Sequence, residues 1–155
     1  MSKEIERKFL VKPTWLSTRI APFVAASRHH IVQGYLSTGD IVVRVRIIDD
    51  RSYITIKNNA FDIERSEFEY PIPFEDAKEM LCMPNVSIIE KFRSVVMYDG
   101  HKWEIDEFVG KNTGLVLAEI ELKSPDEPIN LPEWVGEEVT GNPKYYNVNL
   151  INKQP

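Results

Sequence analysis

Six short runs of this sequence carry two like charges separated by one apolar residue. They lie at residues 4–6, 44–46, 67–69, 91–93, 104–106 and 119–121. Side chains alternate between the two faces of a β-strand, so both charges of each run lie on the same face. A solvated face would explain any single run, but it would mix the two signs, whereas every pair here is purely acidic or purely basic. Because like charges at this spacing destabilise a strand unless they are neutralised, the six runs together predict one shared, highly charged site.

The run that opens the chain adds a cation to its acids. Glu4, Glu6 and Lys8 stand at every second position and therefore share one face. Two carboxylates at that spacing repel each other unless a cation lies between them, and all-oxygen ligands suit Mg²⁺ or Mn²⁺. The run thus predicts a divalent metal ion bound at this strand.

Apolar periodicity and turn signals predict about eight strands and a few short helices. Strands are expected at residues 4–9, 28–37, 41–48, 52–57, 63–72, 86–98, 101–109 and 115–123, and helices at 74–82, 133–138 and 144–152. Residues 15–26 fit either a helix or a loop. The pair Asp99 and Gly100 favours a type I′ hairpin turn, which needs positive φ angles at both positions. Hairpins that follow one another without βαβ alternation predict an antiparallel sheet.

We therefore predict a mainly β (α+β) fold. Eight antiparallel strands suffice for a closed β-barrel whose lumen holds one small ligand, and the charged faces would then point inward. The opposite faces would need a few short helices to cover their apolar side chains, which are Ile5, Phe9, Val43, Val45, Ile47, Ala118, Ile120 and Leu122. A β-sandwich with charged outer faces has the same alternation, so periodicity alone does not separate the two folds.

Composition indicates the class of protein and its surroundings. The 155 residues fit a single domain, 1–155, and a composition of 43% apolar and 28% charged residues is typical of globular proteins. The formal charge is −5 and no Lys/Arg run is present, so we expect neither nucleic acid nor a membrane as partner. Cys82 is the single cysteine and is expected to be buried in its apolar run. The lack of a possible internal disulfide and the charged first residues favour a cytoplasmic protein.

The opening segment, residues 4–11, resembles the ExExK signature of the CYTH domain, or triphosphate tunnel metalloenzyme, family. Further segments resemble the family in the same order, at residues 33–36, 44–46, 55–57, 67–69, 90–93, 103–108, 117–122 and 139–147. ExExK alone is a weak motif, but the ordered set extends over nearly the whole chain and is highly specific. The resemblance implies an eight-stranded antiparallel barrel that forms a tunnel, with a charged interior that binds a triphosphate for hydrolysis assisted by Mg²⁺ or Mn²⁺.

The resemblance also implies roles for single residues. Glu4, Glu6 and Glu121 resemble metal ligands, with Glu119 close to them. The residues that resemble the phosphate-binding set are Lys8, Arg44, Arg46, Lys57, Lys91 and Arg93. The residues that match tunnel acids are Glu67, Glu69, Glu104 and Asp106, which with Lys8 form the catalytic candidates.

Three further residues are judged by strand parity alone. Arg65 lies on the same face as Glu67 and Glu69 and joins the phosphate-binding candidates. Tyr35 is either a hydroxyl inside the tunnel or a strand aromatic. His29 either lines the tunnel mouth or is a surface histidine.

The favoured function is a metal-dependent triphosphatase that converts inorganic tripolyphosphate to phosphate and pyrophosphate, because no further domain is dedicated to a nucleoside. Adenylate cyclase, which the family also contains, would use the same cations on ATP. Thiamine or nucleoside triphosphatase activity and a non-catalytic polyphosphate-binding module would also use these basic residues. The acidic set argues against the binding module, since a polyanion receptor has no use for so many carboxylates. The sequence leaves the oligomeric state open, and a homodimer is one possibility.

Overall fold

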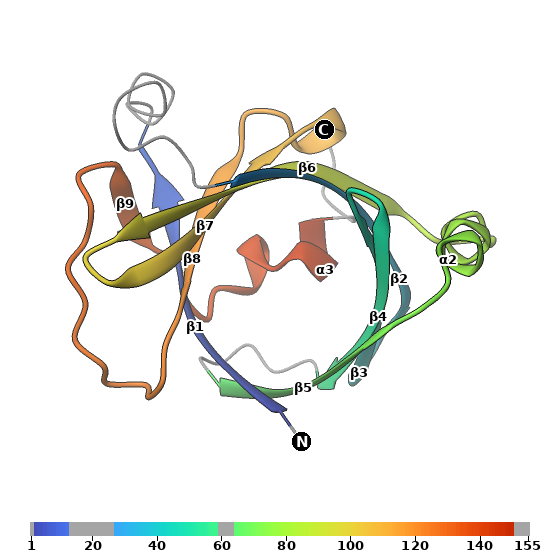
Figure 1. The fold of residues 1–155 in the computed structure, drawn as a ribbon, viewed down its shortest axis with the longest axis horizontal. Coiled ribbons are helices and arrows are strands. Elements are labelled where there is room, and N and C mark those ends of the chain that lie inside the picture. The colour runs from blue at the N-terminus through green and yellow to red at the C-terminus, as the bar shows by residue number, and fades with distance from the viewer. Residues whose placement is uncertain (1, 13–26, 59–63, 151–155) are drawn as a thin grey trace.

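The computed structural model describes residues 2–12, 27–58 and 64–150 (Figure 1). Within these ranges, the side chains of residues 2–4, 64, 65 and 148 are not described. The segment 15–26, for which the sequence left helix and loop open, lies outside the described residues. The side chains of Glu4 and Arg65 also lie outside them, although the backbones of both residues belong to strands.

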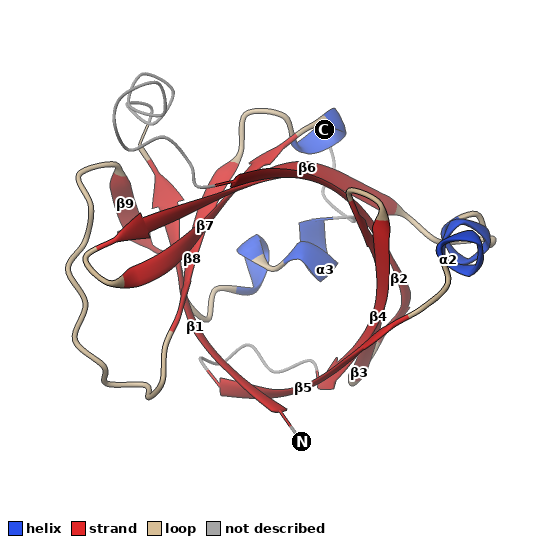
Figure 2. Cartoon of the chain, in the orientation of Figure 1, coloured by secondary structure: helices blue, strands red, loops and turns tan. Residues whose placement is uncertain are grey.

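One antiparallel sheet dominates the described structure (Figure 2). Its nine strands are β1 (Ser2–Val11), β2 (Ser27–Thr38), β3 (Ile41–Ile48), β4 (Arg51–Asn58), β5 (Glu64–Pro71), β6 (Ile88–Tyr98), β7 (His101–Phe108), β8 (Val116–Glu121) and β9 (Val135–Glu138). Their order is β5-β4-β3-β2-β6-β7-β8-β1-β9, and β5 also pairs with β1. The predicted mainly β, antiparallel class is therefore confirmed.

The predicted strand positions agree with the observed ones to within two residues at either end. Asp99 (φ 50°) and Gly100 (φ 79°) both adopt left-handed backbone angles between β6 and β7, as the predicted type I′ turn requires. The helix predicted at 74–82 is α2 (Phe74–Leu81). These elements could be predicted because the signals for them are local.

The helix predicted at residues 133–138 is wrong, because Val135–Glu138 forms β9. This strand pairs with β1, opposing Phe9 to Glu138 and Val11 to Val135 with a register shift between the two pairs. A Cβ at Gly136 would lie 3.1 Å from the carbonyl oxygen of Leu10, so a glycine allows this close approach. The partner strand lies more than a hundred residues earlier, so the local pattern contained no sign of the pairing.

A hydrophobic core lies on the outward faces of β1, β6, β7 and β8. The Trp103 side chain is fully buried and packs against the ring of Phe9 at 5.6 Å and edge-on against Trp134 at 5.5 Å, measured between ring centroids. Trp134 belongs to the connection after β8, and Val135 to β9. In the described part of the chain, a loop and a strand cover this face instead of the predicted helices.

A second core lies on inward faces, at one end of the space that the strands surround. Tyr146 and Leu150, from the C-terminal segment, are buried there in a cluster with Tyr35, Val42 and Phe108. Figure 1 shows α3 (Asn147–Leu150) encircled by the strands. The described part of the helix predicted at 144–152 is thus two short pieces, η2 (Pro143–Tyr145) and α3, and Figure 1 shows α3 inside the ring of strands and not over its outer face. Residues 151 and 152 lie outside the described residues.

Helix α2 covers part of the outer face beside β2. A Cβ at Gly34 would lie 2.6 Å from Val86 Cγ1 and 2.9 Å from Leu81 Cδ2, so the absence of a side chain allows this close packing. Cys82 directly follows the helix and is exposed, which corrects the expectation that it is buried. The longest described helix is α2, with eight residues, and no described helix could span a membrane.

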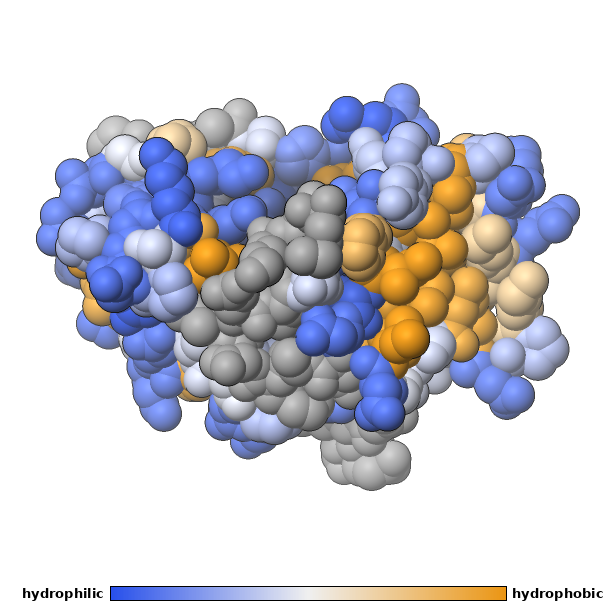
Figure 3. Space-filling model, turned by 90° about the horizontal axis from the view of Figure 1, so that it is seen from below, coloured by the Kyte–Doolittle hydropathy of each residue, from blue (hydrophilic) through white to orange (hydrophobic). Residues whose placement is uncertain are grey.

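The outer face over β3, β4 and β5 is apolar and partly open. Figure 3 shows apolar side chains gathered on this side of the molecule. Its exposed members include Ile41, Ile56, Phe68 and Tyr70. The predicted arrangement, with charged side chains inside the sheet and apolar ones outside, is therefore present, but this part of the outer face is not fully covered by described residues.

Candidate active site

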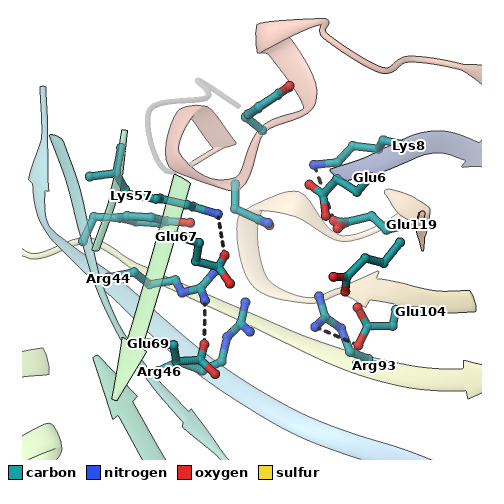
Figure 4. A pocket seen from close by; sticks show the side chains of 15 residues that line it. Glu6, Lys8, Arg44, Arg46, Lys57, Glu67, Glu69, Arg93, Glu104 and Glu119 are labelled. Atoms are coloured by element: carbon teal, nitrogen blue, oxygen red, sulfur yellow. Dashed lines mark ion pairs between the residues drawn. The ribbon is translucent and has the colours of Figure 1, made fainter. Parts of the chain in front are cut away.

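Charged side chains that point inward from the sheet line a cavity of about 230 Å³ (Figure 4). Predicted site residues among the lining are Glu6, Lys8, Arg44, Arg46, Lys57, Glu67, Glu69, Arg93, Glu104, Glu119 and Glu121. Tyr35, Val42, Tyr146 and Asn147 complete it. The described lining therefore combines five cationic side chains with six carboxylates.

Strand register explains why residues far apart in sequence meet here. Glu6 is paired with Glu121, and Lys8 with Glu119, across β1 and β8. Glu119 is in turn paired with Glu104 across β8 and β7. Residues directly opposite in an antiparallel pair point to the same face, so the like-charge runs of neighbouring strands converge on one wall.

On the wall formed by β3, β4 and β5, each cation is matched by a carboxylate or a polar group. Arg44 Nη2 donates a hydrogen bond of 3.0 Å to Thr55 Oγ1 and lies 3.6 Å from a Glu69 carboxylate oxygen. Lys57 Nζ lies 3.8 Å from Glu67 Oε2. The buried Nε of Arg44 has no hydrogen-bond partner among the described residues. A buried guanidinium N–H without an acceptor is costly, so this donor favours a ligand oxygen in the cavity.

A buried charge cluster supports Arg93 from behind the cavity wall. Arg93 donates from Nε and Nη2 to the two oxygens of Asp106, at 2.7 and 2.8 Å. Lys91 Nζ lies 2.7 Å from Asp106 Oδ2 and donates to Asn147 Oδ1 at 3.4 Å. Lys91 and Asp106 are buried and do not line the cavity, unlike the other predicted residues whose side chains are described.

The pKa values of Arg46 and Lys91 are lowered because both side chains are buried close to other cations. Burial, and then repulsion from Arg44 and Arg93, lowers the pKa of Arg46 to about 9. Burial also lowers the pKa of Lys91 to about 7, although the attraction of Asp106 opposes this change. Burial and repulsion between cations disfavour the charged forms of Arg46 and Lys91. An anion that entered the cavity would therefore stabilise these positive charges.

The opposite wall, formed by β1, β7 and β8, is mainly acidic. Lys8 Nζ lies 3.5 Å from Glu119 Oε1, and Figure 4 shows Glu6, Lys8 and Glu119 together on this wall. Burial would raise the pKa of Glu119, but the Lys8 charge, a hydrogen bond with the Glu6 carboxyl group and the Arg93 charge hold it well below its ordinary value. Glu119 is therefore ionised at neutral pH and offers oxygen ligands to a cation.

The acidic wall has the donor chemistry of a site for a hard divalent cation. Among the described side chains, no three His, Cys, Asp or Glu residues converge closely enough to hold a metal ion by themselves. Mg²⁺ in phosphate-handling sites takes one or two carboxylates and completes its shell with water and substrate phosphates. Glu6, Glu119 and the neighbouring Glu121 fit a site in which the protein supplies some of the metal ligands and water and substrate supply the rest.

The C-terminal segment contributes Tyr146 and Asn147 to the cavity lining and was not assigned a role by the sequence. Lys8 Nζ donates to the backbone oxygen of Tyr145 at 3.2 Å and lies 4.8 Å from the ring centroid of Tyr146. Asn147 reaches Lys91 from the same segment. The only sequence signal was the resemblance of residues 139–147 to the closing segment of the family. Of the two interpretations of Tyr35, the structure favours the one that places its side chain among the charged site residues, because Tyr35 lines the cavity.

Comparison with known proteins agrees with this arrangement. The sequence model of the CYTH domain matches residues 2–153. An inorganic triphosphatase from Acetivibrio thermocellus is 42% identical over 153 residues, covering 97% of this chain and 94% of the relative. An inorganic triphosphatase from Nitrosomonas europaea is 33% identical over 159 residues, covering 98% of this chain and 99% of the relative.

A solved structure is similar over the same length. The crystal structure of an inorganic triphosphatase superposes with a TM-score of 0.67 at 31% sequence identity, covering 100% of this chain and 98% of that one. The sequence match and the shared fold both extend over nearly the whole length of the chain, and the charged runs meet in one cavity. This chain therefore belongs to the CYTH domain family.

Proposed function

We propose that this protein is a metal-dependent triphosphatase that hydrolyses inorganic tripolyphosphate to phosphate and pyrophosphate. The observation that carries the proposal is the composition of the cavity lining, in which five cations face six carboxylates. Arginine and lysine side chains suit the oxygens of a polyphosphate, and arginine does so by planar two-point contacts. Because the carboxylates outnumber the cations, the lining alone is a poor receptor for a polyanion. Divalent cations that enter with the substrate would offset the excess negative charge of the lining.

The names of the relatives favour inorganic triphosphate as the substrate. Both curated relatives are named inorganic triphosphatase, and each match covers more than nine tenths of both chains. The cavity has a volume of about 230 Å³, and its lining includes Tyr146 and Asn147. A small substrate without an organic group fits such a site better than a nucleotide does.

The proposed roles follow the two walls. The substrate-binding residues are Lys8, Arg44, Arg46, Lys57, Arg65 and Arg93. The metal ligands are Glu4, Glu6, Glu119 and Glu121, and the catalytic set is Lys8, Glu67, Glu69 and Glu104. The predicted Lys91 and Asp106 do not line the cavity and have positioning roles. Lys91 and Asp106 act from behind the wall, where Asp106 holds the guanidinium of Arg93 in place.

Phosphoryl transfer depends mainly on positioning and on stabilisation of the charge that the phosphoryl oxygens carry in the transition state. The Arg44 Nε donor and the Lys57 ammonium supply that stabilisation from one wall, while Glu69 and Glu67 keep those cations in position. Glu104 lies 3.5 Å from Arg93 Nη1 and is a candidate for orienting the attacking water. A Mg²⁺ or Mn²⁺ ion held by Glu4, Glu6, Glu119 and Glu121 would supply positive charge to the substrate and would lower the pKa of that water.

We also propose that the strands close into an eight-stranded tunnel. The pairing of β5 with β1 supports this, because those strands stand at the two ends of the run β5-β4-β3-β2-β6-β7-β8-β1. The family match over residues 2–153 supports a single domain spanning residues 1–155. The single cysteine, which cannot form an internal disulfide, supports a cytoplasmic location.

A phosphate-release assay tests the function. Folded protein is incubated with Mg²⁺ or Mn²⁺ and with tripolyphosphate, ATP, thiamine triphosphate or longer polyphosphates, and cyclic AMP is measured in the ATP reaction. We expect phosphate and pyrophosphate from tripolyphosphate, and no release after chelation of the metal. Formation of cyclic AMP would instead favour a cyclase, and no turnover of any compound would overturn the hydrolase proposal.

A further inference from the structure

Outside the cavity, Ser27, His29 and Asp49 form a chain of two hydrogen bonds. His29 Nε2 lies 2.9 Å from Ser27 Oγ, and His29 Nδ1 lies 2.6 Å from Asp49 Oδ2. In hydrolases with a serine nucleophile, the histidine contacts the serine through Nε2 and the aspartate through Nδ1. The same nitrogen atoms make the same two contacts here.

The backbone holds the three residues in this relation. Ser27 and His29 are two residues apart on β2 and share one face. Asp49 directly follows β3 with a φ of 55°, a left-handed angle that is uncommon outside glycine. Its second carboxylate oxygen accepts a hydrogen bond from the His30 backbone N–H at 3.1 Å, and its own N–H donates to the His30 carbonyl at 3.0 Å. These two hydrogen bonds with the His30 backbone therefore hold Asp49 in the position from which its carboxylate orients His29.

The three side chains are accessible and separate from the cavity. None of them lines it. The His29 side chain is 25% exposed and that of Asp49 is 42% exposed. Ser27 is half-buried on the same strand. A nucleophile at such a site is open to acyl groups that approach from solvent.

We propose that Ser27 is a nucleophile for acyl transfer from small esters, with His29 as general base and Asp49 as the residue that orients the imidazole. The Ser27 Oγ attacks the ester carbonyl carbon and its proton passes to His29 Nε2. The bond from that carbon to the alcohol oxygen then breaks, and Nε2 returns the proton to the departing alcohol. Water, activated by the same nitrogen, cleaves the acyl-serine to a carboxylic acid and free Ser27. This inference does not depend on the proposed triphosphatase activity.

The test uses the full chain with p-nitrophenyl acetate, and separately with a fluorophosphonate probe that labels activated serines. We expect a burst of p-nitrophenol and a modification that mass spectrometry locates on Ser27. Ser27→Ala should abolish both, and His29→Ala should slow labelling by about 100-fold, the usual size of a general-base contribution. Asp49→Asn should slow labelling as well, since the orienting charge is lost.

Ser37→Ala is the matched control. Ser37 lies on the same strand, and its hydroxyl donates to the Ile41 carbonyl at 2.7 Å. This variant should be labelled at Ser27 as fast as the wild type, and circular dichroism checks that every variant is folded. The proposal is overturned if Ser27 remains unmodified in folded protein, or if it is modified equally fast after His29→Ala.

Discussion

Lys91 and Asp106 form an ion pair of 2.7 Å in which neither side chain reaches the cavity. The same carboxylate accepts two hydrogen bonds from Arg93, which does line the cavity. One buried acid therefore neutralises two cations and fixes the orientation of one of them. Burial alone would raise the pKa of Asp106, but the charges of Arg93 and Lys91 outweigh this and hold it far below its ordinary value.

The first prediction concerns the stability of this cluster. Asp106→Asn leaves buried Lys91 without its paired anion and leaves Arg93 paired with Glu104. It should lower the free energy of unfolding by about 3–5 kcal/mol, the usual effect of breaking a buried ion pair. Chemical denaturation followed by circular dichroism measures this. Asp50→Asn, at an exposed turn position, is the control and should change stability by less than about 0.5 kcal/mol. A loss below about 1 kcal/mol for Asp106→Asn would mean that the cluster contributes little to stability.

The second prediction concerns acid sensitivity. Asp106 and Glu119 have folded-state pKa values below their ordinary values, so the unfolded chain binds more protons than the folded one in acid. Their contribution to stability is complete above the unfolded pKa values of 3.8 and 4.5 and is lost as the pH falls below them. Unfolding free energies measured between pH 7 and pH 3 should therefore fall more steeply for the wild type than for Glu119→Gln, which removes one of these carboxylates and keeps the Lys91–Asp106 pair. Parallel curves would contradict this account.

The third prediction tests the proposed substrate-binding role of Arg44, on the wall formed by β3, β4 and β5. Arg44→Ala removes a buried guanidinium whose Nε has no protein acceptor among the described residues. Each charge-assisted hydrogen bond to a phosphate is worth about 1.5–3 kcal/mol, so kcat/KM for tripolyphosphate should fall by about 10- to 100-fold. Steady-state kinetics measure the change. Arg51→Ala, an exposed arginine on β4, should leave the kinetics unchanged. Equal effects of the two variants would show that only the overall charge matters.

The fourth prediction tests the acidic wall. Glu6→Gln keeps the shape of a cavity residue but removes a carboxylate ligand, so metal-dependent turnover should be lost while the fold is retained. Electron paramagnetic resonance of Mn²⁺, with and without tripolyphosphate, measures binding apart from activity. The exposed Glu137→Gln should behave as the wild type does. Normal turnover by folded Glu6→Gln would remove Glu6 from the metal site.

Strand alternation carried most of the information on the site. It placed both charges of each run on one face of their strand, because the two-residue period of a strand is a local property. The structure showed that this face points inward for Glu6, Arg44 and Glu119. Strand alternation could not separate Arg93, which lines the cavity, from Lys91, which lies on the same face and is fully buried. That difference depends on which side chains from other strands pack around each residue.

The elements that were mispredicted all depend on partners distant in the chain. Strand β9 exists because Val135 and Glu138 pair with β1, and a four-residue segment contains too few residues to show a period. Tyr146 and Asn147 enter the site because the C-terminal segment inserts among the strands, where Tyr146 packs against Tyr35 and Phe108. The sequence of this segment shows its own turns but not where it docks.

By itself, the sequence determined the strands, their antiparallel succession, the charged and apolar faces and the membership of most of the charged site. These features follow from backbone stereochemistry and from the repulsion between neighbouring like charges, which act over a few residues. Only the tertiary structure decided which cations line the cavity, that Lys91 is buried beside Asp106, and that the C-terminal segment contributes to the lining. Those outcomes depend on burial and on ion pairing between strands, which exist only after the sheet has formed.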